Sequence, residues 1–336
     1  VKATSGKIAA KAGTDLSAGT LTAAGNIGLT AGNDILVNQI QSTAGDLNLT
    51  ANRSITNANL NGDINVVGNN LTLTAHNGSI GAADKRLVLA VPGNVEAYAA
   101  NDINLEARVG DLNATNLISQ QGGIQLLVVD GSANIDQASA SRGAVIIDAK
   151  AGISVNNLNV QSLELDSVEA GSTLTLGTVS LGEFMKLAAD NISVGSIEHT
   201  GESSPVHLSM TGGSKAMADN INVTVRSNAG DVFDTFTADK ASVKAYADNV
   251  SFLDTRIGSW ANFRNNNYYV YANNLDKRLT NSDLQIRPEN NSFYLTMATD
   301  RQFLTNAQVM NYLPDFMVNG AISENSLIRQ TSKAIA

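Results

Sequence analysis

The chain of 336 residues contains no cysteine and only four prolines. Without cysteine it can form neither disulfides nor zinc–thiolate sites, and thiol catalysis is excluded. This composition fits a reducing compartment, or a bacterial export route that avoids oxidation in the periplasm. Because proline lacks the backbone N–H, its scarcity permits long ladders of hydrogen bonds between strands.

Long apolar runs, cationic clusters and aromatic residues are also scarce. No apolar run approaches the roughly 18 residues that a membrane-spanning helix needs, so we expect no such helix. Asp and Glu number 31 against 22 Lys and Arg, giving a net charge of −9, which argues against a nucleic-acid surface. The first residues lack a signal peptide and start in mid-repeat, so we expect a piece of a longer protein. With 5% aromatics, the core must consist mainly of Ile, Leu, Val and Ala.

What the sequence does contain is a repeated phrase, seen first in AGNIGLTAGNDILV (24–37). Apolar residues alternate with small or polar ones behind a Gly-Asn pair, which is typical of short strands with one buried face. Gly, Asn and Asp tolerate the sharp turns between such strands. The phrase returns as AGDLNLTAN (44–52), NGDINVV (61–67), NNLTLTA (69–75), AANDINLEA (99–107), AADNISV (188–194), ADNINV (218–223) and ADNVSF (247–252).

Strong strand centres recur every 16 to 22 residues, between LTLT (71–74) and VHLS (206–209). A stack of coils of parallel strands explains both the spacing and the repetition, because each coil lies above the last. We therefore predict an all-β fold, a right-handed parallel β-helix (solenoid) forming an elongated rod of roughly seventeen coils. Gly/Asn-rich coils are expected over 1–230, and an aromatic-rich β-helix continuation with a C-terminal cap or binding region over 231–336.

Six asparagines stand just before expected strands and invite two interpretations. Their amides can stack from coil to coil in hydrogen-bonded ladders, which is the interpretation we favour because the position follows the repeat. Alternatively, exposed amides can recognise sugars. These residues are Asn33, Asn69, Asn101, Asn191, Asn220 and Asn249.

Composition changes near residue 230: fourteen of the sixteen aromatic residues lie at or after Phe233. Bulky side chains can cover the open core edge of a last coil, which is the interpretation we favour. Alternatively, they form a ligand-binding platform, since flat rings pack on sugars or proteins and flanking polar groups bond hydroxyls. The possible ligand-binding residues are Trp260, Phe263, Arg264, Tyr268, Tyr269 and Tyr271. Residues 307–320 lack alternation and are expected to form a short helix or a covering loop.

The phrases AGNIGLTAGNDI, AGDLNLTAN and AANDINLEA, together with the absence of cysteine, resemble the filamentous haemagglutinin-like exoproteins of Gram-negative bacteria. The resemblance implies a two-partner secretion passenger that folds as a long β-helix on the cell surface. It further implies an outer-membrane secretion partner during export, and a role as an adhesin, a biofilm linker or a stalk that carries an effector. The secretion domain of that family has no match here.

The sequence has few residues whose spacing is typical of catalysis or metal binding. His76, His199 and His207 are the only histidines and lack metal-ligand spacing, and neither a nucleophile elbow nor a phosphate loop is present. No metal, cofactor or catalytic residue is therefore expected. Because β-helices also host polysaccharide lyases and glycoside hydrolases, carboxylates from stacked coils stay open as an alternative. The candidates are Asp231, Asp234, Asp239, Asp254 and Glu289, with Arg256 and Arg264.

The sequence thus predicts a secreted surface adhesin segment that forms a rigid stalk for attachment to host cells, neighbouring cells or biofilm matrix. Its expected partner is a glycan or protein receptor, or a matrix polysaccharide, and not a nucleic acid. The alternatives are a polysaccharide-active β-helix enzyme and the stalk of a contact-dependent toxin delivery protein.

Overall fold

The computed structural model describes residues 1–201, 204–227 and 230–246, followed by strands at 249–257, 267–271, 274–279, 284–289 and 292–297; side chains are described up to residue 245. The chain divides into two compact units, unit 1 (Val1–Glu169) and unit 2 (Ala170–Ala336). None of the described residues belongs to a helix, so this part of the chain offers no helix that could cross a membrane.

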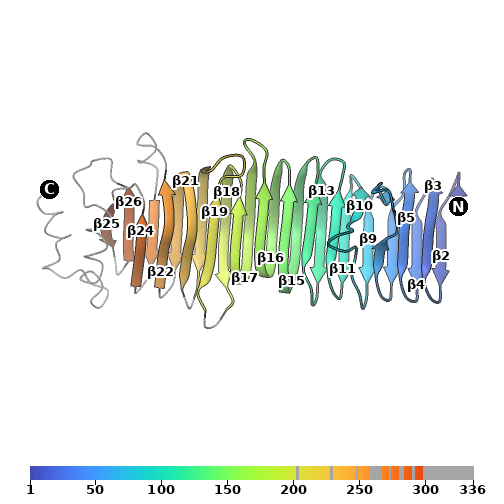
Figure 1. Cartoon of the computed structure of the whole chain (residues 1–336), viewed down its shortest axis with the longest axis horizontal. Coiled ribbons are helices and arrows are strands. Elements are labelled where there is room, and N and C mark those ends of the chain that lie inside the picture. Colours follow the sequence, from blue (N-terminus) through green and yellow to red (C-terminus); the bar gives the residue numbers. More distant parts are fainter. Residues whose placement is uncertain are drawn as a thin grey trace, which may run out of the picture. The chain divides into compact units, whose positions relative to one another are not determined.

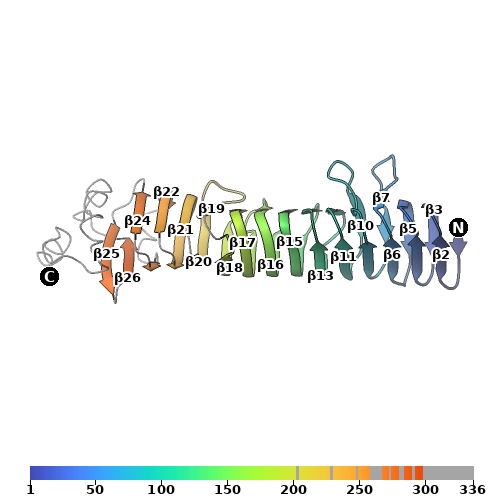
Figure 2. The ribbon, with the colours of Figure 1, turned by 90° about the horizontal axis from the view of Figure 1, so that it is seen from below.

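Unit 1 is a stack of coils in which each strand pairs in parallel with a strand of the next coil (Figures 1 and 2). Its strands are β1 (Lys2–Ala3), β2 (Ile8–Ala12), β3 (Leu16–Ala23), β4 (Ile27–Ala31), β5 (Ile35–Ser42), β6 (Leu47–Ala51), β7 (Ile55–Asn57), β8 (Val66–Val67), β9 (Leu71–Ala75), β10 (Leu87–Ala90), β11 (Asn94–Ala99), β12 (Ile103–Ala107), β13 (Leu112–Ser119), β14 (Ile124–Val128), β15 (Ser132–Ala149) and β16 (Gly152–Ser167).

The interior of unit 1 consists of aliphatic columns, because residues of one kind occupy the same place in successive coils. One column contains five isoleucines, Ile35, Ile55, Ile80, Ile103 and Ile124, all almost completely buried. Full burial of each such side chain contributes about 1.5–3 kcal/mol. The strand phrase therefore repeats because the cross-section repeats.

Unit 2 continues the same parallel pattern over most of its described strands. These are β17 (Thr173–Ala188), β18 (Asn191–His199), β19 (Val206–Thr211), β20 (Ala218–Arg226), β21 (Asp231–Tyr246), β22 (Asn249–Ile257), β23 (Asn267–Tyr271), β24 (Asn274–Leu279), β25 (Leu284–Glu289) and β26 (Ser292–Met297). The last strand differs, since β26 pairs antiparallel with both β23 and β25. Only two residues join β25 to β26, too few for the crossover that parallel strands require.

The parallel β-solenoid predicted from the sequence is confirmed, but the predicted number of coils is too high. The described residues make about 12 turns rather than seventeen. Equivalent positions lie 19 residues apart between Asp15 and Asp34, but 29 apart between Asn191 and Asn220. Some coils are therefore longer than the repeat phrase suggests, because they contain inserted loops.

The composition change near residue 230 falls within unit 2, at the start of β21. Phe233 and Phe236 on this strand are fully buried, with ring centroids 5.9 Å apart and planes at 84°. This edge-to-face arrangement is a favoured packing of aromatic rings. These two rings therefore pack in the core, whereas the predicted cover of the last coil falls on residues whose side chains are not described.

Side-chain acceptors before the strands link successive coils of unit 1. The Asp34 N–H donates to Asp15 Oδ1 (3.2 Å), and the Ser54 N–H donates to Asp34 Oδ1 (2.9 Å). The series continues from Ser79 N to Ser54 Oγ (3.2 Å), from Asp102 N to Ser79 Oγ (3.3 Å) and from Gly123 N to Asp102 Oδ1 (2.8 Å). These turn residues therefore satisfy backbone donors at the corners, where the strand ladder is interrupted.

The predicted asparagine ladder is only partly present. Asn220 Nδ2 donates to Asn191 Oδ1 at 2.9 Å, which confirms the prediction for this pair. Asn69 Nδ2 instead donates to the Asp46 carboxylate at 3.3 Å. The turn positions before the strands thus need a side chain that accepts a hydrogen bond from the next coil, and Asp or Ser can supply it as well as Asn. Asn33 and Asn101 accept through their main-chain carbonyls, and the Asn249 side chain lies outside the described residues.

Candidate functional site

Two consecutive coils of unit 1 carry insertions at one corner. Val37 and Ile40 are separated by two residues, whereas their register partners Asn57 and Val66 are separated by eight. The six extra residues extend this corner to an eight-residue segment, loop A (58–65). The next coil has a second insertion, loop B (81–86), between Ile80 and β10. Figure 2 shows both loops projecting from the same side of unit 1, near β7 and β10.

Loop A is fixed by the Asn65 side chain, which is fully buried. Its amide NH₂ donates to the carbonyls of Val37 (3.1 Å) and Asn38 (3.0 Å) and to Asn57 Oδ1 (2.8 Å), while its Oδ1 accepts from Val88 N–H (2.9 Å). Both amide groups are thereby used. A saturated buried amide holds the loop in one conformation, because any other would leave these groups unpaired.

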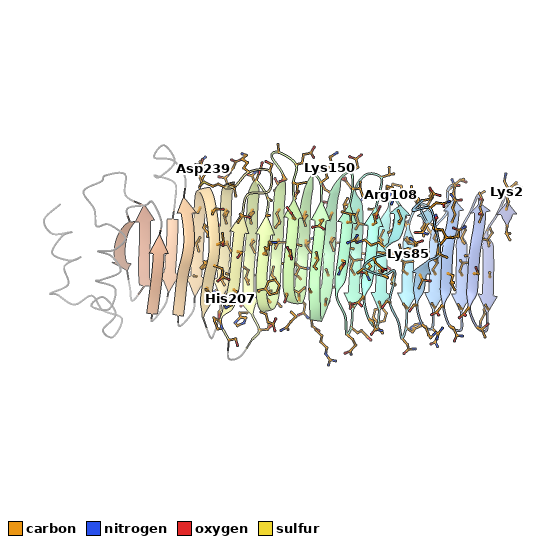
Figure 3. The ribbon with its side chains drawn as sticks, viewed as in Figure 1. Lys2, Lys85, Arg108, Lys150, His207 and Asp239 are labelled. Atoms are coloured by element: carbon orange, nitrogen blue, oxygen red, sulfur yellow. The ribbon has the colours of Figure 1, made fainter. Side chains whose placement is uncertain are left out.

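Further contacts join loop A to loop B and to the following coil. Asn57 Nδ2 donates to the Arg86 carbonyl at 2.8 Å. The Arg108 guanidinium donates to the Gly62 carbonyl in loop A and pairs with Glu106 beside it. Figure 3 labels Lys85 of loop B and Arg108. Asn57 also accepts from Asn59 and Asn65 of loop A, so it links the bases of the two loops. Leu60 of loop A is 91% exposed.

Gly81→Ala is expected to destabilise unit 1, because Gly81 has φ +64° and an added Cβ would lie 2.3 Å from the Asn104 carbonyl oxygen. The left-handed conformation alone costs a residue with a Cβ about 1–2 kcal/mol, and the clash adds to this. Urea unfolding measures the loss. Gly28→Ala is the matched control: it has open space and an ordinary φ, so it should be neutral or slightly stabilising. Equal stability of the two variants would contradict the strain argument.

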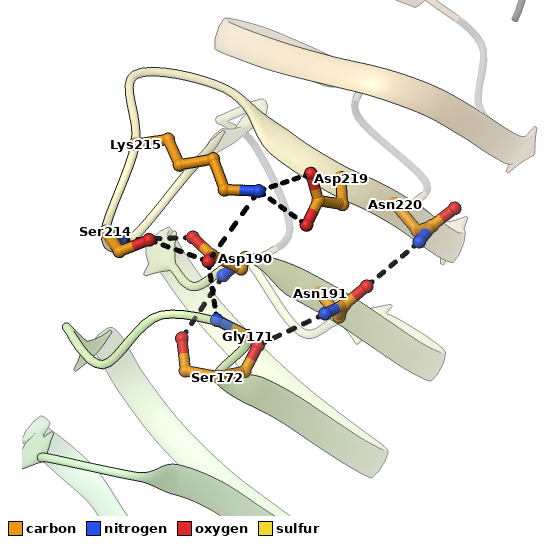
Figure 4. Close-up of polar contacts among 8 residues, drawn as sticks. All are labelled: Gly171, Ser172, Asp190, Asn191, Ser214, Lys215, Asp219 and Asn220. Carbon is orange, nitrogen blue, oxygen red and sulfur yellow. Dashed lines mark hydrogen bonds and ion pairs between the residues drawn. The ribbon is translucent and has the colours of Figure 1, made fainter.

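Unit 2 contains a comparable insertion, loop C (212–219). Ala188 and Asn191 are separated by two residues, and their partners Thr211 and Asn220 by eight. The fully buried Asp190 lies at this corner, as Figure 4 shows. Its carboxylate accepts hydrogen bonds from Gly171 N–H (2.8 Å), Ser214 N–H (3.1 Å) and Ser214 Oγ (2.7 Å).

The electrostatics of Asp190 favour a permanent charge. Burial raises the pKa of its carboxyl group, but the hydrogen bonds from Gly171 and Ser214 and the Lys215 ammonium outweigh burial, so the pKa lies below its ordinary value. Lys215 Nζ is 3.9 Å from Asp190 and closer to Asp219, at 2.6 Å. With three donors on the carboxylate, Asp190 is suited to holding loop C rather than to transferring a proton.

His199 and Ser227 form a second polar cluster in unit 2. His199 Nδ1 lies 3.2 Å from Ser227 Oγ, and its Nε2 lies 3.0 Å from the Gly182 carbonyl. Because a carbonyl only accepts, Nε2 must carry a hydrogen. The one hydroxyl hydrogen of Ser227 then faces two acceptors, Nδ1 of the neutral ring and the Gly230 carbonyl at 3.0 Å. Ser227 Oγ also accepts from Gly230 N–H at 3.0 Å. A nucleophile–base pair needs a hydroxyl free to attack, whereas these groups link three coils.

Asp231 is the most unusual charged residue of the described chain. It is 1% exposed and pairs in register with the core residue Val206. Neither carboxylate oxygen has a hydrogen-bond partner among the described residues. Burial raises the pKa of Asp231 to about 7, against a smaller opposing effect of the Ser227 hydroxyl. The Ser227 hydrogen bonds go to Gly230 and His199, so the carboxyl group remains uncompensated.

The possible ligand-binding residues fall at the margin of the described structure. Trp260, Phe263 and Arg264 lie outside the described residues. Tyr268, Tyr269 and Tyr271 belong to β23, which pairs in parallel with β21, but their side chains are not among those described. The ligand platform stays a prediction.

The candidate catalytic carboxylates whose side chains are described do not lie together. Asp231 is buried in the interior, whereas Asp234 lies at the outer surface and pairs with His207 at 3.0 Å (Figure 3 labels His207). The wall of the coil therefore separates these two carboxyl groups. Asp239 acts on the Lys215 ammonium electrostatically. Asp254, Arg256 and Glu289 lie on β22 and β25, with side chains beyond those described, and Arg264 lies outside the described residues.

Sequence reasoning missed Asn65 and Asp190, the two buried polar residues that fix inserted loops. Both lie within repeat phrases, NGDINVV (61–67) and AADNISV (188–194), which do not distinguish them from exposed turn residues. Their only further signal in the sequence is a longer interval between strand phrases. Within the described ranges, no group of three or more His, Asp or Glu residues could hold a metal ion. Comparison of the chain with family models, curated proteins and solved structures finds no match.

Proposed function

We propose that this chain is a segment of a secreted surface adhesin of the filamentous haemagglutinin-like type, in which solenoid coils form a stalk. Exported through an outer-membrane partner, it would attach a Gram-negative cell to host cells, neighbouring cells or matrix polysaccharide. The observation that carries the proposal is the use of turn side chains. From Asp15 to Asp102, turn side chains accept hydrogen bonds from the next coil, so the repeated turn residues serve to stack the coils.

The interior supports the same proposal. Columns such as the five isoleucines are fully buried and contain no polar group that a substrate could reach. Repeat units of this kind contact only their neighbours, so length can be added without new core design. Inserted loops, which in solenoids commonly form the binding face, then supply the variable surface.

A bead-retention assay tests the proposal. Because the chain has no cysteine, one added at the N-terminus couples it to fluorescent beads in a single orientation. We expect wild-type beads to be retained on epithelial monolayers, bacterial cells or a glycan array well above albumin-coated beads. If the beads were retained on none of these surfaces above the albumin control, the adhesive function would be contradicted. Release of sugars from a polysaccharide panel would favour the enzyme alternative instead.

The aromatic cluster gives a specific prediction within this assay. If Trp260 and Tyr269 stack on a sugar, Trp260→Ala with Tyr269→Ala should lower glycan-array binding by about tenfold or more. Phe184→Ala is the control, because Phe184 is also exposed, at 42%, but lies outside the cluster. Unchanged glycan binding of the double variant would leave the cluster with a packing role.

A further inference from the structure

Loops A and B of unit 1 display one apolar side chain on a fixed polar base. Leu60 is the most exposed large apolar residue of the described chain, at 91%. Single exposed apolar residues are common on protein surfaces, so exposure alone means little. The difference here is that loop A cannot fold back to bury Leu60, because Asn65 and Asn59 beside it are held by hydrogen bonds.

The base of loop A is ordered through backbone as well as side-chain contacts. Asn59 N–H donates to Asn57 Oδ1 at 2.8 Å, and Asn61 N–H donates to Asn59 Oδ1 at 2.9 Å. Leu60 therefore lies between two residues whose N–H groups are fixed. A side chain presented in this way loses little conformational entropy on binding, which favours association.

From these observations we propose that Leu60 is the anchor of a protein-binding site formed by loops A and B, and that it enters an apolar pocket of a folded partner protein. This inference rests on the proposed adhesive function and names the class of receptor. A projecting side chain is complementary to a pocket and not to another projection, so a two-fold contact between copies of Leu60 fits less well.

The composition of the loops argues for a protein and against other partners. Loops A (ANLNGDIN) and B (GAADKR) contain no aromatic residue, whereas stacking rings are the usual apolar contact for sugars. The two loops also carry charged residues of both signs, of which Asp63, Asp84 and Lys85 are exposed. Such a mixed rim suits a polar protein surface, whereas anionic lipid or nucleic acid would require a cluster of cations.

The test uses the full chain on beads, with epithelial monolayers, bacterial cells and phosphatidylcholine–phosphatidylserine vesicles as the probes. Leu60→Ser should lower retention on cells by about tenfold to a hundredfold, because the pocket would lose its apolar occupant. Leu60→Met keeps an apolar side chain and should retain most binding. Val168→Ser removes another exposed apolar residue of unit 1, 58% exposed, and should have no effect.

Two further arms separate the sources of binding. Asn65→Ala keeps Leu60 but releases loop A, so retention should fall while hydrogen exchange in residues 58–65 increases. Trypsin treatment of the target cells should abolish the Leu60-dependent retention. Equal retention of wild type and Leu60→Ser would overturn this inference alone. Leu60-dependent binding to vesicles or to trypsin-treated cells would overturn the protein partner, and no wild-type retention on any surface would overturn both this inference and the adhesive function.

Discussion

Replacing Asp231 by asparagine is expected to stabilise unit 2 by up to about 4 kcal/mol at pH 8 and to change its stability little at pH 4. The cause is the burial of an uncompensated carboxyl group in the aliphatic interior, which raises its pKa to about 7. In the unfolded chain the same carboxyl group has its ordinary pKa of 3.8. Between these two values the folded state therefore binds more protons than the unfolded state.

The sign of the pH dependence follows directly. The stability associated with Asp231 is fully present below about pH 4 and is lost as the pH rises through about 7. Wild-type unit 2 should thus weaken between these values, whereas Asp231→Asn should not show this component. Urea unfolding at several pH values, followed by hydrogen exchange in peptides from β19 to β21, measures the effect.

Asp234→Asn is the matched control, three residues along the same strand. Its carboxylate is partly exposed and pairs with His207, also partly exposed, so its removal should cost less than about 1 kcal/mol. The prediction would be contradicted if wild type and Asp231→Asn differed in stability by the same amount at pH 4 and at pH 8. That result would show that the carboxyl group is compensated in the folded protein.

Asp190→Ala should have an effect of similar size and opposite direction, destabilising unit 2 by about 3–5 kcal/mol at neutral pH. The substitution leaves Gly171 N–H and the Ser214 N–H and hydroxyl without their acceptor, beside the Lys215 ammonium. Loop C would lose its attachment, so hydrogen exchange in residues 212–219 should increase first.

The pH dependence of Asp190 is the reverse of that of Asp231. Because hydrogen bonds and Lys215 hold its pKa below the ordinary value despite burial, its stabilisation is present at neutral pH and is lost as the pH falls below about 4. Asp219→Ala is the control, since Asp219 is 44% exposed and its carboxylate pairs with the exposed Lys215 ammonium. An unchanged urea midpoint for Asp190→Ala would contradict its role in holding loop C.

By itself, the sequence determined the architecture of the coil. Alternation as in Ile27-Gly28-Leu29 requires a strand with one buried face, and its repetition requires stacking. The Gly/Asn/Asp turns follow because these residues tolerate sharp turns and supply acceptors to the next coil. Such signals are local, so they can be read from a few neighbouring residues.

Only the tertiary structure decided what lies at the corners. The roles of Asn65 and Asp190 depend on backbone groups 23 to 28 residues away for Asn65, and 19 and 24 residues away for Asp190. Asp231 looks like any turn aspartate before a strand, yet register places it beside Val206 in the interior. Hydrogen-bond saturation and burial depend on contacts between coils. Since coil length varies with each inserted loop, those contacts follow from the pairing register and not from spacing along the chain.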